Sequence, residues 1–283
     1  MPTQKGLTIQ ILSKLRIGAG ANNGTALVHR APQDGALSHP NRAVATGAAR
    51  RIVMIADLAR SDVHMPTQTC LVLMFKAPQH SKRRLAAAIG DHARTAAQHL
   101  FACAAEDLAD WRGPTCLAPA QTEDLRIAEE LECQASTSVE QGAGNLGERI
   151  QHVNATLRKA GYERQIFIGI DCPALDSNYL ARADALLAQT DVVLGPADDG
   201  GVVLMGVRGL WPPLADLPWS TDALRDALAG ACKLAQQRVS MLEAHADVDL
   251  VDDLQQLPVR LSDDMRPARR RLCDWIESGS FAC

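Results

Sequence analysis

Hydrophobic positions along the chain fall into short apolar runs separated by longer segments of helical period. The runs Cys70–Phe75 (CLVLMF) and 165–170 (QIFIGI) are almost continuously apolar, which is typical of strands buried on both faces of a sheet. Weaker runs predict strands over 115–118, 191–194, 202–207 and 238–242. Between them, the pattern predicts helices over 82–108, 122–131, 146–160, 177–189, 221–234 and 263–278. Strands alternating with helices indicate an α/β fold, with a mainly parallel sheet and helices on both faces.

The first 64 residues do not share this pattern. The stretch 18–47 is rich in Gly, Ala, Asn and Pro and has no sustained period, so we expect a disordered extension over 1–68 before a domain over 69–283. The tetrapeptide Met-Pro-Thr-Gln occurs at Met1 and again at Met65, just before the first predicted strand. Translation from Met65 in the native protein and plain coincidence explain this repeat equally well, and the intact mass of the native protein separates them.

Composition and charge argue against several classes of protein. General nucleic-acid binding relies on basic surfaces that neutralise phosphates, and the net charge is −4, so we expect no nucleic-acid partner. The sequence contains no run of about 18 apolar residues, so we expect no association with a membrane through a spanning helix. The eight cysteines are scattered without a Cys-x-x-Cys pair, which is typical of reduced, buried thiols in a cytoplasmic protein.

Charged and glycine-rich segments follow several predicted strands. In such sheets the carboxyl ends of the parallel strands meet at one edge, and ligands bind there. Lys76, Lys82 and Arg84 follow the first strand and open a helix, where cations and free N–H groups form an anion site. A solvated basic helix start explains these cations equally well. Gly142 and Gly144 precede a later helix and permit close approach of a phosphate, although a flexible helix entry would need the same glycines.

Asp171 directly follows the buried run 165–170, and Pro173 stops that strand from continuing. A carboxylate at this edge can hold a divalent cation that bridges substrate phosphates. The alternative role is to cap the following helix, but Asp176 suits that role better, so we favour the metal site. Cys172 is interpreted as a packed thiol, because no histidine lies nearby in the sequence, although its position leaves a reactive role open.

The segment GPADDGG at 195–201 joins two predicted strands at the same edge as Asp171. Its proline and paired glycines predict a tight loop. A plain turn would explain Asp199, Gly200 and Gly201, but two adjacent acids at a strand end favour contact with a substrate.

Two later segments provide further candidates. Trp219, Ser220 and Thr221 enter a helix and are candidates for contact with a substrate, although Ser220 or Thr221 could serve only as a helix cap. In 247–254 (DVDLVDDL), alternating acids follow the last predicted strand and could complete a metal site with Asp171. A capped terminal helix with a solvated acidic face is the alternative.

The order of these segments resembles a bacterial family called "rSAM/selenodomain-associated transferase 1", whose members are similar to glycosyltransferases and to 2-phospholactate guanylyltransferase. The family pattern runs K-A-P-x-x-G-x-x-K-T-R-L, Q-G-x-G-D-L-G-E-R, G-x-D-C-P-x-L, G-P-A-x-D-G-G, W-S-T and D-V-D-T-x-x-D-L. The chain resembles it from about Cys70 to Leu254. The resemblance implies a Rossmann-like nucleotide-diphospho-sugar transferase (GT-A) fold and metal-dependent handling of a nucleotide-activated donor, with Mg²⁺ or Mn²⁺ as cofactor.

The resemblance also implies roles for individual residues. Asp171 matches the metal-binding aspartate at the strand end, and Asp249 matches a late position that often supplies a second ligand. Lys82 and Arg84 match the cations that contact phosphate. With these roles, we expect Asp199 to position the acceptor or to act as a general base.

The first loop departs from the family pattern. It is two residues shorter, with Ser81 and Arg83 where Gly and Thr stand in the family. The main hypothesis is a glycosyltransferase-like enzyme that uses a nucleotide-activated donor and a small-molecule acceptor. The alternatives are a nucleotidyltransferase joining an NTP to a phosphorylated acid or sugar, and a degenerate protein that binds nucleotide without turnover. The oligomeric state is left open, with a homodimer as one option.

Overall fold

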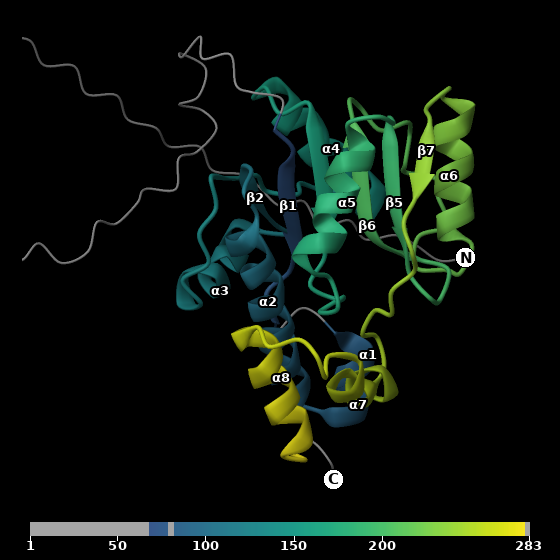
Figure 1. Ribbon diagram of the computed structural model, residues 1–283. Helices are drawn as coiled ribbons and strands as arrows, with labels where there is room; N and C mark the ends of the chain where they lie inside the picture. Colours follow the sequence, from purple (N-terminus) through teal and green to yellow (C-terminus); the bar gives the residue numbers. More distant parts are fainter. Residues whose placement is uncertain (1–67, 79–81, 281–283) are drawn as a thin grey trace, which may run out of the picture. The chain divides into compact units, whose positions relative to one another are not determined.

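Within the residues that the computed structural model describes, 68–78 and 82–280, seven strands form one sheet in the order β3-β2-β1-β4-β6-β5-β7 (Figure 1). The predicted extension over 1–68, apart from Gln68, and the repeat at Met65 lie outside the described residues. The strands are β1 (Cys70–Phe75), β2 (Thr115–Pro119), β3 (Thr137–Ser138), β4 (Arg164–Ile168), β5 (Val192–Pro196), β6 (Val202–Arg208) and β7 (Val239–Met241).

Strand directions decide which loops can share a site. β1 runs parallel to β2 and to β4, β2 to β3, and β5 to β7. Only β6, among these strands, is antiparallel to its neighbours β4 and β5. This arrangement confirms the predicted mainly parallel sheet. It also places the segments after β1, β4, β5 and β7 at one edge, which we call the carboxyl edge.

Alternate side chains of each strand enter different cores, as expected of strands buried on both faces. In β1, Leu71, Leu73 and Phe75 join one hydrophobic cluster, and Cys70 and Val72 join the other. The first cluster also contains residues of α1 (Arg83–Ile89), α2 (His92–Asp110), α3 (Leu125–Glu130), α5 (Ser177–Leu187), α7 (Val251–Arg260) and α8 (Pro267–Glu277). The second contains residues of α4 (Leu146–Lys159) and α6 (Leu224–Leu234). Helices therefore cover both faces, as predicted (Figure 1).

The helix predicted over 82–108 is instead two helices, α1 and α2. Gly90 adopts a φ of +55°, and its N–H donates to the carbonyl oxygen of Ala86. A left-handed glycine of this kind ends a helix because it lacks the Cβ that opposes this conformation. The chain then restarts as α2 at His92. The apolar period continues across the break, which is why the prediction was wrong.

Other helix boundaries follow from capping. The side chain of Asp176 accepts a hydrogen bond from the backbone N–H of Tyr179 at 2.6 Å, which confirms its predicted role as N-cap of α5. Asn145 and Glu148 form a reciprocal capping box at the start of α4. Gly161 has a φ of +95° just after α4, consistent with the predicted stop. None of the described helices is both long and apolar enough to cross a membrane.

Candidate functional site

The carboxyl edge brings together side chains that are far apart in the sequence. The backbone N–H of Val248, after β7, donates to the carbonyl oxygen of Asp171, after β4, at 2.8 Å. Lys82, at the start of α1, places its Nζ 2.5 Å from Asp171 Oδ1 and also donates to the carbonyl oxygen of Val248. The sequence predicted that these three segments share an edge, and the structure confirms it.

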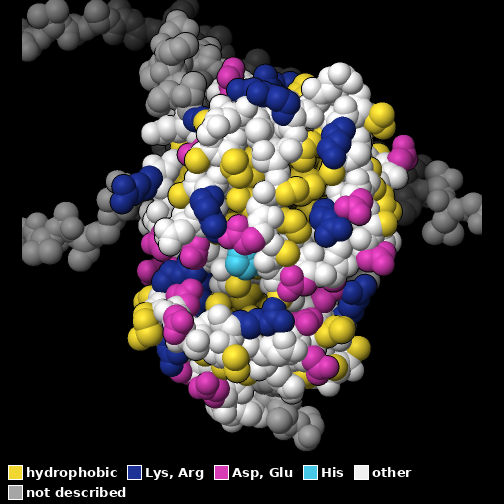
Figure 2. Space-filling view, turned by 45° about the vertical axis from the view of Figure 1, so that its right-hand side comes forward, with side chains coloured by type: hydrophobic (Ala, Val, Ile, Leu, Met, Phe, Trp, Pro, Cys, Tyr) yellow, Lys and Arg dark blue, Asp and Glu magenta, His cyan; other side chains and the backbone are white. Residues whose placement is uncertain are grey.

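We use the name edge site for six charged residues, which are Lys82, Arg84, Asp171, Asp199, Asp247 and Asp249. On the face shown in Figure 2, basic and acidic side chains lie beside one another around a hollow. Lys82 is the buried member of the edge site, with a side chain only 4% exposed, whereas that of Asp171 is 52% exposed. A nearly buried ammonium needs a counter-ion, and Asp171 provides it.

The predicted phosphate-binding cations are paired with the predicted metal-binding carboxylates. Lys82 contacts Asp171, and Arg84 Nη1 lies 2.5 Å from Asp249 Oδ2. The Arg84–Asp249 pair is largely exposed, so its contribution to stability is only about 0–1 kcal/mol, and a ligand can separate it at low cost. To bind a phosphate and a cation, Lys82 and Arg84 would have to exchange their contacts with Asp171 and Asp249 for contacts with the ligand. Such binding stays a prediction.

Asp247 belongs to the same cluster, although only its neighbour Asp249 was predicted as a ligand. Burial, followed by the negative charges of Asp199, Asp249 and Asp171, raises the pKa of Asp247 to about 6. The available signal was the alternation in Asp247-Val248-Asp249, since residues two apart in an extended segment share a side. Four carboxylates thus repel one another at this edge.

We expect Asp247→Asn to stabilise the protein at neutral pH. The folded-state pKa of Asp247, about 6, lies above its ordinary value of 3.8, so the ionised carboxylate opposes folding. This cost appears as the pH rises from about 4 through about 6 and is fully present above that range. The melting temperature of the variant should therefore exceed that of the wild type at pH 7.5, and the two should converge at pH 4. A variant that melts below the wild type at pH 7.5 would contradict the prediction.

Cys172 lies next to Asp171 but is a poor nucleophile in this setting. Its side chain is buried, and burial raises the pKa of its thiol to about 12, with a further contribution from the charge of Asp247. A neutral, enclosed thiol does not attack. Of the two roles left open by the sequence, the structure favours the packed thiol.

The loop between β5 and β6 forms a tight turn at the same edge. Asp199 Oδ1 accepts a hydrogen bond from the N–H of Gly201 at 2.9 Å, as in a side-chain-capped turn. Gly200 has a φ of +91°, and a Cβ built there would lie 2.1 Å from the carbonyl oxygen of Asp222. The plain turn, which was the alternative, therefore explains Gly200, and the negative charge of Asp199 also raises the pKa of Asp247. Contact of Asp199, Gly200 and Gly201 with a substrate stays a prediction.

Gly200→Ala is expected to destabilise the protein by about 1–3 kcal/mol, because the new methyl group clashes with backbone and the residue is held at positive φ. Gly230→Ala is the matched control. Gly230 lies inside α6, and nothing beyond the backbone of its own helix comes within 4 Å of the place a Cβ would take, so alanine there should be neutral or stabilising by about 0.5–1 kcal/mol. Urea denaturation of both variants measures the difference. Equal stabilities for the two variants would show that the loop relaxes around the added methyl.

The segment Trp219-Ser220-Thr221 packs beside this loop. Trp219 Nε1 donates to the carbonyl oxygen of Leu214 at 2.8 Å. Thr221 Oγ1 donates to the carbonyl oxygen of Pro218 at 2.7 Å and accepts from the N–H of Ala223. These contacts lie in the turn before α6, whose N-cap is Ala223, so neither Ser220 nor Thr221 takes the capping role that was the alternative. Contact of the three residues with a substrate stays a prediction.

The glycine loop before α4 is anchored by Gln141. This buried side chain donates to the carbonyl oxygens of Phe75 at 3.1 Å and Ala118 at 2.7 Å, and so ties the loop to the ends of β1 and β2. Gly142 and Gly144 both have positive φ, of +77° and +96°. The loop therefore lies at the carboxyl edge, where phosphate contact by these glycines remains a prediction. The sequence pattern did not mark Gln141 as a separate anchor.

One further observation concerns metal binding, and another concerns a cavity away from the edge site. Within the described residues, no group of three or more His, Cys, Asp or Glu is arranged to hold a metal ion. Metal binding by the two predicted ligands, Asp171 and Asp249, stays a prediction. A cavity of about 480 Å³ lies elsewhere, beside the amino ends of β1, β2 and β4, and is lined in part by Thr69, Gly113 and Arg164. No edge-site residue lines that cavity.

Comparison with known proteins identifies the fold. A family model described as "Uncharacterized protein conserved in bacteria (DUF2064)" matches residues 102–221. The crystal structure of a candidate nucleotide-diphospho-sugar transferase from Desulfovibrio desulfuricans G20 superposes with a TM-score of 0.66 at 24% identity, over 74% of this chain and 95% of that one. The chain has the fold of the nucleotide-diphospho-sugar transferases. This Rossmann-like GT-A fold, with its mainly parallel sheet, confirms the predicted fold class.

More distant likenesses were also found to two other proteins with solved structures. The bifunctional IspDF from Campylobacter jejuni superposes with a TM-score of 0.46 at 11% identity, over 67% of this chain and 54% of that one. A cytidylyltransferase from Leptospira borgpetersenii serovar Hardjo-bovis superposes with a TM-score of 0.44 at 11% identity, over 75% of this chain and 94% of that one. No curated protein matches the sequence. The nucleotide-diphospho-sugar transferase fold does not by itself specify a reaction, so the function is argued from the edge site.

Proposed function

We propose that the protein is a transferase that binds a nucleotide-activated donor and a small-molecule acceptor at the edge site. The observation that supports this most is the convergence of Lys82 and Arg84 with four aspartates at the carboxyl edge. Ligands of open α/β sheets bind at this edge. Guanidinium and ammonium groups bind phosphates, and carboxylates bind the cations that accompany phosphates.

The proposal includes Mg²⁺ or Mn²⁺, held by Asp171 and Asp249 with Asp247 close by. Carboxylate oxygens are suitable ligands for such cations. Burial is the main cause of the raised pKa of Asp247, and the negative charges of Asp199, Asp249 and Asp171 add to it; a divalent cation would relieve that second contribution. When bound, the cation would neutralise charge on the departing phosphate group. Side chains must move by small amounts to ligate it, since Asp171 and Asp249 are now paired with Lys82 and Arg84.

The residues of this chain would then take separate tasks. Lys82 and Arg84, released from their aspartates, would bind the donor phosphates and stabilise the negative charge that develops in the transition state. Asp199 would position the acceptor or accept its proton through the oxygen that does not cap the loop. Further donor and acceptor contacts are proposed for Lys76, Gly142, Gly144, Gly200, Gly201, Trp219, Ser220 and Thr221.

Product analysis separates the two transfer reactions. A glycosyltransferase-like reaction releases a nucleoside diphosphate, because the sugar leaves the diphosphate. A nucleotidyltransferase releases pyrophosphate, because the acceptor attacks the α-phosphate of an NTP. The glycosyltransferase-like reaction is our main proposal, and binding of nucleotide without either product would instead indicate a degenerate protein.

A thermal-shift screen tests donor binding directly. NTPs and nucleotide sugars are each added with Mg²⁺ or Mn²⁺, and a ligand at about 100 times its Kd stabilises the native state by about 2.7 kcal/mol. We expect at least one donor class to raise the melting temperature. No shift with any member of the panel would contradict the proposed function.

Removal of the divalent cation is expected to abolish most of that shift. Without the cation, the carboxylates of Asp171 and Asp249 face the donor phosphates as like charges, and donor affinity falls. The screen is therefore repeated with EDTA, with the ionic strength matched by NaCl. An equal shift in EDTA would remove the metal from the proposal and leave Lys82 and Arg84 as the phosphate-binding groups.

A further inference from the structure

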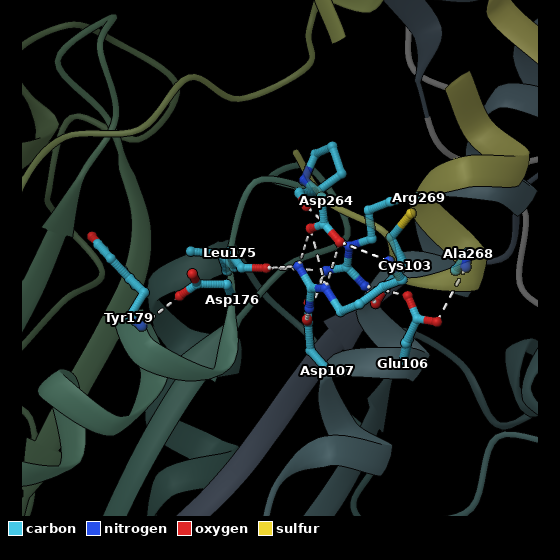
Figure 3. A network of polar contacts seen from close by, with 11 residues as sticks. Cys103, Glu106, Asp107, Leu175, Asp176, Tyr179, Asp264, Ala268 and Arg269 are labelled. Atoms are coloured by element: carbon cyan, nitrogen blue, oxygen red, sulfur yellow. Dashed lines mark hydrogen bonds and ion pairs between the residues drawn. The ribbon is translucent and has the colours of Figure 1, made fainter. Parts of the chain in front are cut away.

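Arg269 in α8 is completely buried, which is unusual for an arginine. A single guanidinium nitrogen, Nη2, contacts both carboxylate oxygens of Asp107, at 2.6 Å from Oδ1 and 2.7 Å from Oδ2 (Figure 3). Nη1 contacts Glu106 Oε2 at 3.0 Å and the carbonyl oxygen of Cys103 at 2.5 Å. These contacts fix the guanidinium against α2. Nε and Nη2 of the same guanidinium also reach the loop between β4 and α5.

The guanidinium of Arg269 donates hydrogen bonds to two backbone carbonyl groups of this loop. Arg269 Nε donates to the carbonyl oxygen of Pro173 at 3.1 Å, and Nη2 donates to that of Leu175 at 3.1 Å. Arg266 donates to the same Leu175 carbonyl oxygen at 2.7 Å and pairs with Asp107 at 2.7 Å. Figure 3 shows Leu175 facing this cluster. Arg269 of α8 and Arg266, the N-cap residue just before that helix, therefore both bind the loop through its backbone.

This loop follows Ile168, the last residue of β4, and Asp171 of the edge site is its third residue. Pro173 lies two residues after Asp171, and Asp176 at the end of the loop caps α5. Val248 holds the start of the loop through the carbonyl oxygen of Asp171. The contacts from α8 are the ones that fix its middle. The orientation of the Asp171 carboxylate depends on this backbone, because a side chain at a loop start follows the backbone that carries it.

We propose that Arg269, assisted by Arg266, is a positioning residue that fixes the Asp171 loop for the donor. This inference rests on the proposed function for its purpose, but the constraint itself can be tested without any donor. Stability alone does not require such a cluster, because well-packed hydrophobic residues of similar volume often replace a buried ion pair without loss. Hydrophobic residues, however, cannot donate hydrogen bonds to the carbonyl groups of Pro173 and Leu175, which need donors inside the protein.

The double variant Asp107→Leu/Arg269→Met separates a role in positioning the loop from a role in stability alone. It removes the buried charges together and so should stay folded, while the Pro173 carbonyl loses its donor and Leu175 keeps only Arg266. Cys172 reports on the loop, because its thiol is buried there in the wild type. We expect modification of Cys172 by a maleimide, read by peptide mass spectrometry, to become at least about tenfold faster.

Cys116 in β2 is the internal reference, because it is fully buried and outside the loop. Leu228→Ala is the matched control variant, since it creates a cavity in the second hydrophobic cluster, which does not contain Cys172. Cys116 shares that cluster with Leu228, so this variant should not make Cys172 label faster relative to Cys116. Arg269→Lys provides a second variant if the double variant fails to fold. It keeps the positive charge but loses the planar fork, so Cys172 should again label faster than Cys116.

Unchanged labelling of Cys172 in a folded variant would overturn the positioning role. If a donor raises the melting temperature of the wild type in a metal-dependent way, the same variant should lose most of that rise. An undiminished rise would also overturn the positioning role of Arg269. A wild type that binds no donor would instead count against the proposed function. In that case the labelling rates still decide whether Arg269 constrains the loop.

Discussion

Replacing Arg269 by methionine alone is expected to lower the free energy of unfolding by about 3–5 kcal/mol, because it leaves the buried carboxylate of Asp107 without its main partner. Native domains are typically stable by only about 5–15 kcal/mol, so the variant should be marginal. Even beside two arginines, burial raises the pKa of Asp107 to about 6 from an ordinary 3.8. Urea denaturation at pH 7.5, followed by tryptophan fluorescence, measures the loss.

The pH dependence and a double-mutant cycle check the cause. Without Arg269 the folded-state pKa of Asp107 should rise further, so the loss should grow as the pH rises through 6. It should shrink as the pH falls below the ordinary pKa of 3.8, where the carboxyl is mostly neutral in both states. Asp107→Leu/Arg269→Met should lose much less than Arg269→Met. A single variant within about 1 kcal/mol of the wild type would show that the ion pair is not a major determinant of stability.

The sheet was largely predictable because its central strands are buried on both faces. A continuous apolar run such as Cys70–Phe75 must be buried on both sides, which a central strand of a covered sheet allows. β3 was missed because it has only two residues, and its pairing with β2 rather than its own composition makes it a strand. The antiparallel direction of β6 is likewise set by its partners and has no local signal.

The edge site was predictable for a related reason, since the carboxyl ends of parallel strands must share one edge. The rule brought Lys82, Asp171 and Asp249 together before any distance was known. It could not show which charges pair with each other, because pairing depends on side-chain reach. Nor could it identify Arg269, which lies 162 residues from Asp107 in an amphipathic helix with two further arginines, Arg270 and Arg271, beside it. Buried charges are exceptions to the pattern on which sequence interpretation relies.

Asp171→Asn is expected to weaken donor binding in the presence of Mg²⁺ or Mn²⁺ by about 10–100-fold, because loss of even an outer-shell partner of a metal ligand typically costs that much in metal affinity. Asparagine keeps the shape of the side chain but removes the charge that would hold the cation. Isothermal titration with the donor identified by the thermal-shift screen gives the affinity. Asp198→Asn is the matched control, because Asp198 is an exposed carboxylate near this edge, 3.9 Å from Arg260, and contributes nothing to the raised pKa of Asp247. It should bind within about twofold of the wild type.

Titration in EDTA separates the loss of a metal ligand from damage to the fold. Lys82 is almost buried, and in the variant it keeps only the carbonyl oxygen of Val248 and a neutral amide as partners. Its ammonium is then more available to a phosphate, and one negative charge has gone from the site. Without a divalent cation, Asp171→Asn should therefore bind the donor at least as tightly as the wild type does. If the variant is weaker both with and without the cation, Asp171 acts through structure, and the metal site belongs elsewhere on the carboxyl edge.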